Sequence, residues 1–175
     1  MTDLRYPIGE FSYIREGTSA DRAGWIDAIA AVPSRLRTAV TGLTERQLDT
    51  PYRPEGWTVR QVVHHVPDSH LNAYIRIKLA LTEERPVIKP YEEARWAELA
   101  DSTGPIEVSL RMLEALHERW TLLLRSLGPS DFTRTFYHPG SKLDFTIDRA
   151  LAMYAWHGAH HVAHVTELAK REVWR

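Results

Sequence analysis

Residues 58–83 read TVRQVVHHVPDSHLNAYIRIKLALTE, and this stretch is the strongest structural signal in the chain. Its apolar side chains recur at helical spacing, which predicts an amphipathic helix that starts after an N-cap at Thr58 and ends near Glu83. Pro67 lies inside the helix and should bend its axis, because proline removes one backbone hydrogen bond. A helix with one apolar face needs other helices to cover that face.

Three more segments carry the same periodicity, at residues 21–43, 105–127 and 146–171. Ser19 is the expected N-cap of the first helix, and Thr146 is the expected N-cap of the last. Pro33 should kink the first helix or split it in two. Four long helices of this kind predict an all-α fold, a four-helix bundle.

The remaining segments are short connections around this bundle. Residues 1–17 have no helical period and predict an irregular arm, and residues 84–99 predict an extended linker followed by a short helix. The alternating stretch SDFTRTFYHPGSKLDFT, residues 130–146, predicts a small β-hairpin with a Pro-Gly turn. Nothing divides the chain in two, so residues 1–175 are expected to form one domain.

The composition excludes several functional classes. Hydrophobic residues make up 43% of the chain and charged residues 26%, as in an ordinary globular protein, and the formal net charge of -1 marks no nucleic-acid or membrane partner. The first residues, MTDLRYPIGEF, do not resemble a signal peptide, so a cytoplasmic location is expected. Because the chain has no cysteine, a metal site must use His, carboxylate, amide or water ligands.

Four of the nine histidines fall within the segment YAWHGAHHVAH at residues 154–164. On a helix they form two i,i+4 pairs, His157 with His161 and His160 with His164, and either pair could bind one metal ion from one helix face. Neither pair carries the glutamate of the zinc-protease motif. The spacing leaves the choice between the two pairs open.

A catalytic centre with three protein ligands needs one more histidine. His65 is the best candidate, because it stands between an apolar stripe and a row of polar residues, which are Gln61, Asp68, Ser69, Asn72 and Arg76. His64 points about 100° away from His65 and would not share the site. His117 lies among charged residues and is expected at the solvated surface, and His138 lies in the hairpin turn.

These motifs together resemble the DinB-like superfamily of four-helix metalloproteins, and most closely its YfiT branch of metal-dependent hydrolases. The resemblance is carried by EGWTVRQVVHHVPDSHLNAYIRIKLALTE with the later PVIKPYEEARWAEL, and by YAWHGAHHVAH. It extends from about residue 6 to residue 167. Many members continue with Arg-Gly-Gln after the last histidine, where this chain has Val165-Thr166-Glu167, so no role of that motif is expected here.

The resemblance implies a divalent metal held by one histidine of the second long helix and two of the last. Matching the Trp57-Thr58 helix start assigns the first ligand to His65, and the late pair assigns the others to His160 and His164. The other late pair stays the alternative. The resemblance also implies zinc, or nickel, as the metal, with one ion per subunit of a homodimer.

Three functions could use such a centre. A metal-dependent hydrolase would activate water on the ion to attack a small electrophilic substrate, with Asp68 as general base. Related proteins are thiol S-transferases that use a low-molecular-weight thiol, bacillithiol in some bacteria. In that case Asn72 and Arg76 would hold an anionic group of the thiol cofactor. A non-enzymatic metal-binding dimer would need a fourth protein ligand, from His138 or His157.

Overall fold

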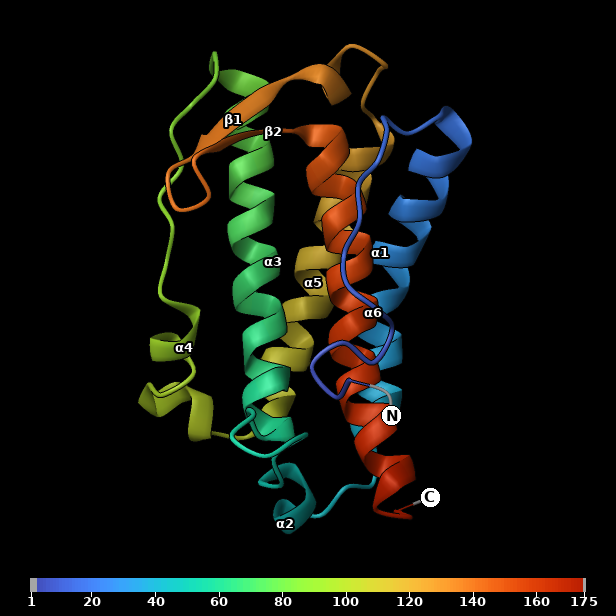
Figure 1. Cartoon of the computed structure of the whole chain (residues 1–175), viewed down its shortest axis with the longest axis vertical. Helices are drawn as coiled ribbons and strands as arrows, with labels where there is room; N and C mark the ends of the chain where they lie inside the picture. Colours follow the sequence, from blue (N-terminus) through green and yellow to red (C-terminus); the bar gives the residue numbers. More distant parts are fainter. Residues whose placement is uncertain (1–2, 175) are drawn as a thin grey trace.

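The computed structural model describes residues 3–174 and is a four-helix bundle (Figure 1). Its long helices are α1 (Ser19–Val40), α3 (Val59–Thr82), α5 (Ile106–Arg125) and α6 (Ile147–Arg171). The connections contain helices α2 (Glu45–Leu48) and α4 (Glu93–Trp96), 3₁₀ turns at Ala100–Thr103 and Asp131–Thr133, and the antiparallel strands β1 (Thr135–His138) and β2 (Leu143–Thr146). The all-α bundle with one hairpin, as expected from the sequence, is confirmed. No helix of the described residues combines the length and apolar character that a membrane crossing requires.

Each long helix packs against two others. Helices α1 and α3 each lie beside both α5 and α6, so the four helices form a ring around a common core. Residues 83–105 run back along the outside of α3, which lets α3 and α5 point in the same direction (Figure 1). Residues 3–17 cross the outer face of α6, and the hairpin covers the end of the bundle where α3 ends and α6 begins (Figure 1).

Two groups of buried apolar side chains fill the bundle. One surrounds Trp120 and extends to the two strands, and the other surrounds Leu113 toward the opposite end. Between these groups lie buried histidines, among them His65, His70 and His117. The chain therefore places a layer of imidazoles across the middle of the bundle core.

Threonines fix the starts of the long helices. Thr58 accepts a hydrogen bond from the backbone three residues on and begins α3, and Thr146 does the same for α6, so both expected N-caps are confirmed. The expected cap at Ser19 is wrong by one residue. Thr18 is the cap: its hydroxyl accepts from the Asp21 backbone N–H, and its own backbone N–H donates to the Asp21 carboxylate, which completes a capping box.

Both internal prolines lie in continuous helices. Pro33 lies within α1 and Pro67 within α3, so the expected alternative of a split at Pro33 is wrong. Because proline has no N–H, the carbonyl four residues earlier loses its helical donor. In α1 this is the Ile29 carbonyl, which accepts a hydrogen bond from Nδ1 of His117 at 2.7 Å instead. Helix α5 thus supplies the donor that α1 lacks.

Helix α6 packs tightly against α1 at Gly158. A Cβ atom at this position would overlap a methyl group of Val32. Only glycine permits this contact, which brings the histidine-bearing stretch of α6 against the bundle interior.

A buried carboxylate ties the N-terminal arm to the bundle. Asp148, near the start of α6, is 1% exposed. It accepts hydrogen bonds from the Tyr13 hydroxyl at 2.7 Å, the Gly17 backbone N–H at 2.9 Å and Arg22 Nε at 2.5 Å. The arm is therefore irregular, as expected from its sequence, but it is held firmly where it enters α1.

Candidate metal centre

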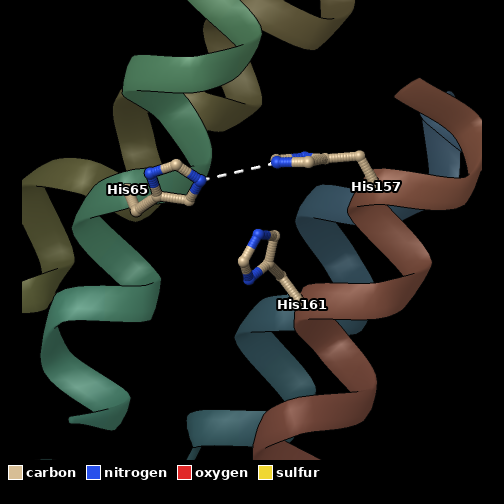
Figure 2. Close-up of side chains that lie close together, drawn as sticks. All are labelled: His65, His157 and His161. Atoms are coloured by element: carbon tan, nitrogen blue, oxygen red, sulfur yellow. Dashed lines mark hydrogen bonds between the residues drawn. The ribbon is translucent and has the colours of Figure 1, made fainter. Parts of the chain in front are cut away.

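Two helices bring three histidines together within the imidazole layer. His65 projects from α3, and His157 and His161 project toward it from successive turns of α6 (Figure 2). The Nε2 atoms of His65 and His157 lie 3.4 Å apart, and the ring centroid of His161 lies 4.8 Å from that of His65 and 4.5 Å from that of His157. Within residues 3–174 this is the one group of three metal-binding side chains whose ligand atoms all lie within 4.8 Å of one another.

This donor set fits a divalent metal ion. In a tetrahedral zinc site with bonds of about 2.0–2.1 Å, two ligand nitrogens stand about 3.3 Å apart. The observed separation of 3.4 Å between Nε2 of His65 and Nε2 of His157 matches this nitrogen–nitrogen distance. Among the described residues, no fourth His, Cys, Asp or Glu joins the group. His138, a possible fourth ligand in the sequence, does not belong to it. Three imidazoles with an open position are the ligand pattern of a catalytic centre, and imidazole suits zinc, nickel, copper and iron.

Burial keeps the three rings neutral. Desolvation lowers the pKa of His65 to about 4, and it lowers the pKa of His157 and His161 well below the ordinary value, with neighbouring imidazoles adding to the effect. A histidine must be neutral to bind a metal ion. The rings are therefore in their metal-binding form at neutral pH.

Other side chains fix the rings of the group. The Trp57 ring lies 4.5 Å from the His65 ring and 6.4 Å from the His161 ring, centroid to centroid. Ser69 Oγ lies 3.5 Å from His157 Nε2. The centre thus has an aromatic wall on one side and a hydroxyl on the other.

Two more buried histidines stand behind His157. Its Nδ1 lies 3.1 Å from Nε2 of His70, and Nδ1 of His70 lies 2.8 Å from Nε2 of His117. His117 then reaches the carbonyl of Ile29, as described above. His70 is 0% exposed and His117 is 2% exposed, so this series of hydrogen bonds is closed to solvent.

The expectation that His117 is a solvated surface residue is therefore wrong. The charged residues beside it in the sequence point outward, whereas His117 shares a buried stripe of α5 with Leu113, Trp120 and Leu124. These residues lie three, four or seven positions from it, which is the helical spacing of one face. That spacing is the signal that could have placed His117 inside.

The other late pair of histidines faces the N-terminal arm. The His160 ring lies 4.3 Å from that of Trp156 and 5.9 Å from that of Tyr6. The His164 ring stacks on Tyr52 at 3.9 Å, and its Nε2 lies 3.1 Å from a carbonyl of the arm. Aromatic residues and the arm thus occupy the side of α6 that carries this pair.

The structure consequently does not bring His160 and His164 to His65, as motif matching had assigned. It brings together His65 and the pair that was the alternative, His157 and His161. The physical reason is the rotation of α6 about its own axis. Only about 60° separates His157 from His160 on the helix, so residue counting could not decide which of them faces α3.

Asp68 and Asn72 follow His65 along α3. Asp68 is half-buried, and desolvation together with the nearby Asp101 raises its pKa to about 6. Asn72 donates from Nδ2 to the Asp68 carbonyl at 2.9 Å. Its side chain also borders an open groove beneath α4, together with Tyr91 and other residues of the linker.

Arg76 is buried without an acidic partner. It is 8% exposed, donates to the Lys89 carbonyl at 3.3 Å, and lies 6.0 Å from the Tyr91 ring centroid. Within the described part of the chain it forms no ion pair. It lines a small, partly open cavity of about 130 Å³, with Tyr154 and His138 among the other wall residues. A buried guanidinium without a carboxylate is a ready receptor for an anion.

Comparison with known proteins links this arrangement to one family. The family model of the DinB superfamily matches residues 28–165. A Bacillus mycoides protein named "Putative metal-dependent hydrolase" is 55% identical over 174 residues, which are 99% of this chain and 100% of that protein. A protein of the same name from Oceanobacillus iheyensis is 55% identical over 170 residues, or 97% of this chain and 98% of that protein.

A solved structure has the same fold. The structure of YfiT from Bacillus subtilis, described as "a probable metal-dependent hydrolase with an unusual four-helix bundle topology", matches with a TM-score of 0.97 at 50% identity. The match covers 99% of this chain and 100% of that one. The bundle and its crossover along α3 are thus shared with that protein over their whole length.

Proposed function

This chain belongs to the DinB superfamily, and on that footing we propose that it is a metal-dependent hydrolase whose divalent ion is held by His65, His157 and His161. The observation that carries the proposal is the convergence of three neutral imidazoles from two helices on one point, with one position left open. A divalent ion bound there supplies Lewis acidity at neutral pH for attack on a small electrophilic substrate. Zinc and nickel are the first metals to test.

Asp68 is the proposed general base. It lies on α3 less than one turn beyond His65, and its raised pKa of about 6 stands near neutral pH. A base with a pKa close to the working pH combines a large deprotonated fraction with useful proton affinity. In the proposed reaction the Asp68 carboxylate takes the proton from the attacking nucleophile.

Arg76 and Asn72 are proposed to bind an anionic group of the substrate or of a second substrate. The support for Arg76 is its burial without a carboxylate, on the same helix as His65. A guanidinium offers paired donors that match a carboxylate. Asn72 lies one turn earlier, where the groove beneath α4 opens to solvent, so the two side chains would hold one end of an elongated molecule.

A thiol S-transferase is the second candidate on the same centre. The observation that favours it is the buried Arg76, which has no carboxylate partner and lines a small cavity, and which suits the anionic group of a small thiol such as bacillithiol. The absence of cysteine from the chain means that any reacting thiol must enter from solution. The metal-binding set would be the same in both reactions. A homodimer remains part of the proposal by family resemblance.

The two reactions are separated by one experiment. Zinc- and nickel-loaded protein is incubated with a panel of esters and amides, and in parallel with small thiols plus a chlorinated aromatic acceptor. We expect hydrolysis in the first panel, and loss of it in a His161→Ala variant that is folded but metal-free. Thiol conjugates without any hydrolysis would replace the hydrolase with the transferase. Inactivity in both panels would leave a metal-binding protein without an enzymatic role.

A further inference from the structure

The hydrogen bonds behind His157 have a single direction. The Ile29 carbonyl can only accept, so the proton of His117 must be on Nδ1, which leaves Nε2 of His117 as an acceptor. His70 must then donate from Nδ1 to His117, and its own Nε2 must accept. That acceptor faces Nδ1 of His157, which therefore carries a proton. Nε2 of His157 is left with its lone pair.

The starting point of this series is set by Pro33. A carbonyl inside a helix normally accepts from the N–H four residues on, but Pro33 has none. The Ile29 carbonyl is therefore free to accept from α5, and it does so at 2.7 Å. Val32 and Ile29 are among the fully buried residues of α1, so water does not compete for this acceptor.

We propose that the Ile29 carbonyl, His117 and His70 form a tautomer relay, which holds His157 with its proton on Nδ1 and its lone pair on Nε2, aimed at the metal position. The relay rests on the proposed metal site and extends it by two positioning residues, His70 and His117. Neither of them touches the ion. They act through His157, because an imidazole protonated on Nε2 could not bind a metal through that atom.

Burial holds the relay in one set of tautomers. Both positioning rings are closed to solvent, and each nitrogen of these two rings has one partner. Reversing one tautomer would leave two N–H groups facing each other at one link and two lone pairs at another. An unmade hydrogen bond in a dry interior is costly, so the one consistent set of tautomers prevails.

Three variants test the relay, with zinc as the probe. His70→Leu removes the acceptor of His157, and we expect it to lower zinc affinity about 10- to 100-fold in competition with a chromophoric chelator. His70→Gln keeps an acceptor, since its Oε1 can stand where Nε2 of His70 stood, and we expect affinity within about threefold of the parent protein. His64→Leu is the matched control, because His64 is buried on the same helix but bonds to Ser109 and Gly104. Its zinc affinity should not change. Equal losses in all three variants would overturn the relay.

A second measurement does not depend on zinc or on any variant. Long-range ¹H–¹⁵N spectra of the metal-free protein report which nitrogen of each histidine carries the proton. We expect Nδ1–H in His117, His70 and His157 together. Nε2–H in any of the three would overturn the relay. If the parent protein binds no zinc but shows the expected tautomers, the metal site fails and the relay stands.

Discussion

At the scale of single residues, α6 carries two histidine pairs that differ in what their rings touch. His157 and His161 face α3, whereas His160 and His164 face aromatic residues and the N-terminal arm. The pairs have the same spacing and similar burial, so only their surroundings distinguish them. This makes a sharp comparison possible, because His160 and His161 are adjacent and equally buried, at 7% exposure each.

The first prediction uses that comparison. His161→Ala should lower zinc content, measured by elemental analysis after dialysis against a weak chelator, by more than about tenfold, because it removes one of the three proposed ligands. His160→Ala should keep the zinc content of the parent protein. The reverse outcome would restore the assignment made by motif matching, with His160 and His164 as ligands.

The second prediction concerns Asp68 and pH. Burial raises the pKa of Asp68 to about 6 in the folded protein, above its ordinary value of 3.8. The folded state therefore holds the proton more tightly than the unfolded chain does. This contribution to stability is complete below pH 3.8 and is lost as pH rises through about 6.

Replacing Asp68 with Asn removes that loss. At pH 7, Asp68→Asn should increase the free energy of unfolding by about 1 kcal/mol, a figure discounted for the partial exposure of the side chain. At pH 4 the two proteins should have nearly equal free energies of unfolding in urea denaturation.

Asp68 also has an expected effect on activity. Once a substrate is known, kcat/KM of the parent protein should rise with pH through about 6, and the variant should lose about 10²-fold or more in kcat. A variant with full activity would exclude Asp68 as the base.

At the scale of elements, the contact between α1 and α6 depends on one missing side chain. Alanine at position 158 should raise intrinsic helix stability by about 1 kcal/mol, since glycine is a poor helix former. The overlap with Val32 opposes this. We expect Gly158→Ala to lower the free energy of unfolding by about 1–3 kcal/mol. Adding Val32→Ala should recover part of the loss. A stabilised single variant would show that the helices separate easily.

The junction of the arm, α1 and α6 gives a fourth prediction. Asp148→Asn removes the charge that Arg22 and Tyr13 contact in a buried setting. Breaking a buried ion pair costs about 3–5 kcal/mol, so the midpoint of urea denaturation should fall strongly. Asp3→Asn breaks an exposed ion pair with Arg5 and should leave the midpoint of urea denaturation nearly unchanged. Similar effects in both variants would contradict this account.

The sequence predicted the positions of the helices and the hairpin better than it predicted which face each helix turns toward its neighbours. Thr58, Thr146 and the Pro-Gly turn are local signals with local outcomes, and the helices and hairpin follow them. The burial of His117 could have been predicted from its spacing on α5, but its hydrogen bond to the Ile29 carbonyl could not, because that bond joins two helices far apart in the sequence. The choice between the histidine pairs likewise depends on how α6 is rotated against α3, which packing decides.

At the scale of the whole molecule, a bound ion should stabilise the bundle. Only the folded chain brings His65, 92 residues away in sequence, to His157. With free zinc at about 100 times its Kd, the ion adds about 2.7 kcal/mol to the free energy of unfolding. For a chain of this size that corresponds to a rise in Tm of about 5–10 °C. Thermal scans with zinc and with chelator would measure the shift, and the His161→Ala protein should show none.

The imidazole layer has a further consequence for how the bundle opens. The series of hydrogen bonds behind His157 joins all four long helices through Ile29, His117, His70 and His157. The direction of each hydrogen bond in the series depends on the preceding one. Detaching α3 or α6 would separate the three proposed ligands, and detaching α1 or α5 would remove a hydrogen bond behind His157. If an ion binds at the proposed site, it therefore disfavours partly opened forms as well as the fully unfolded chain, and the opening of the four helices becomes more cooperative.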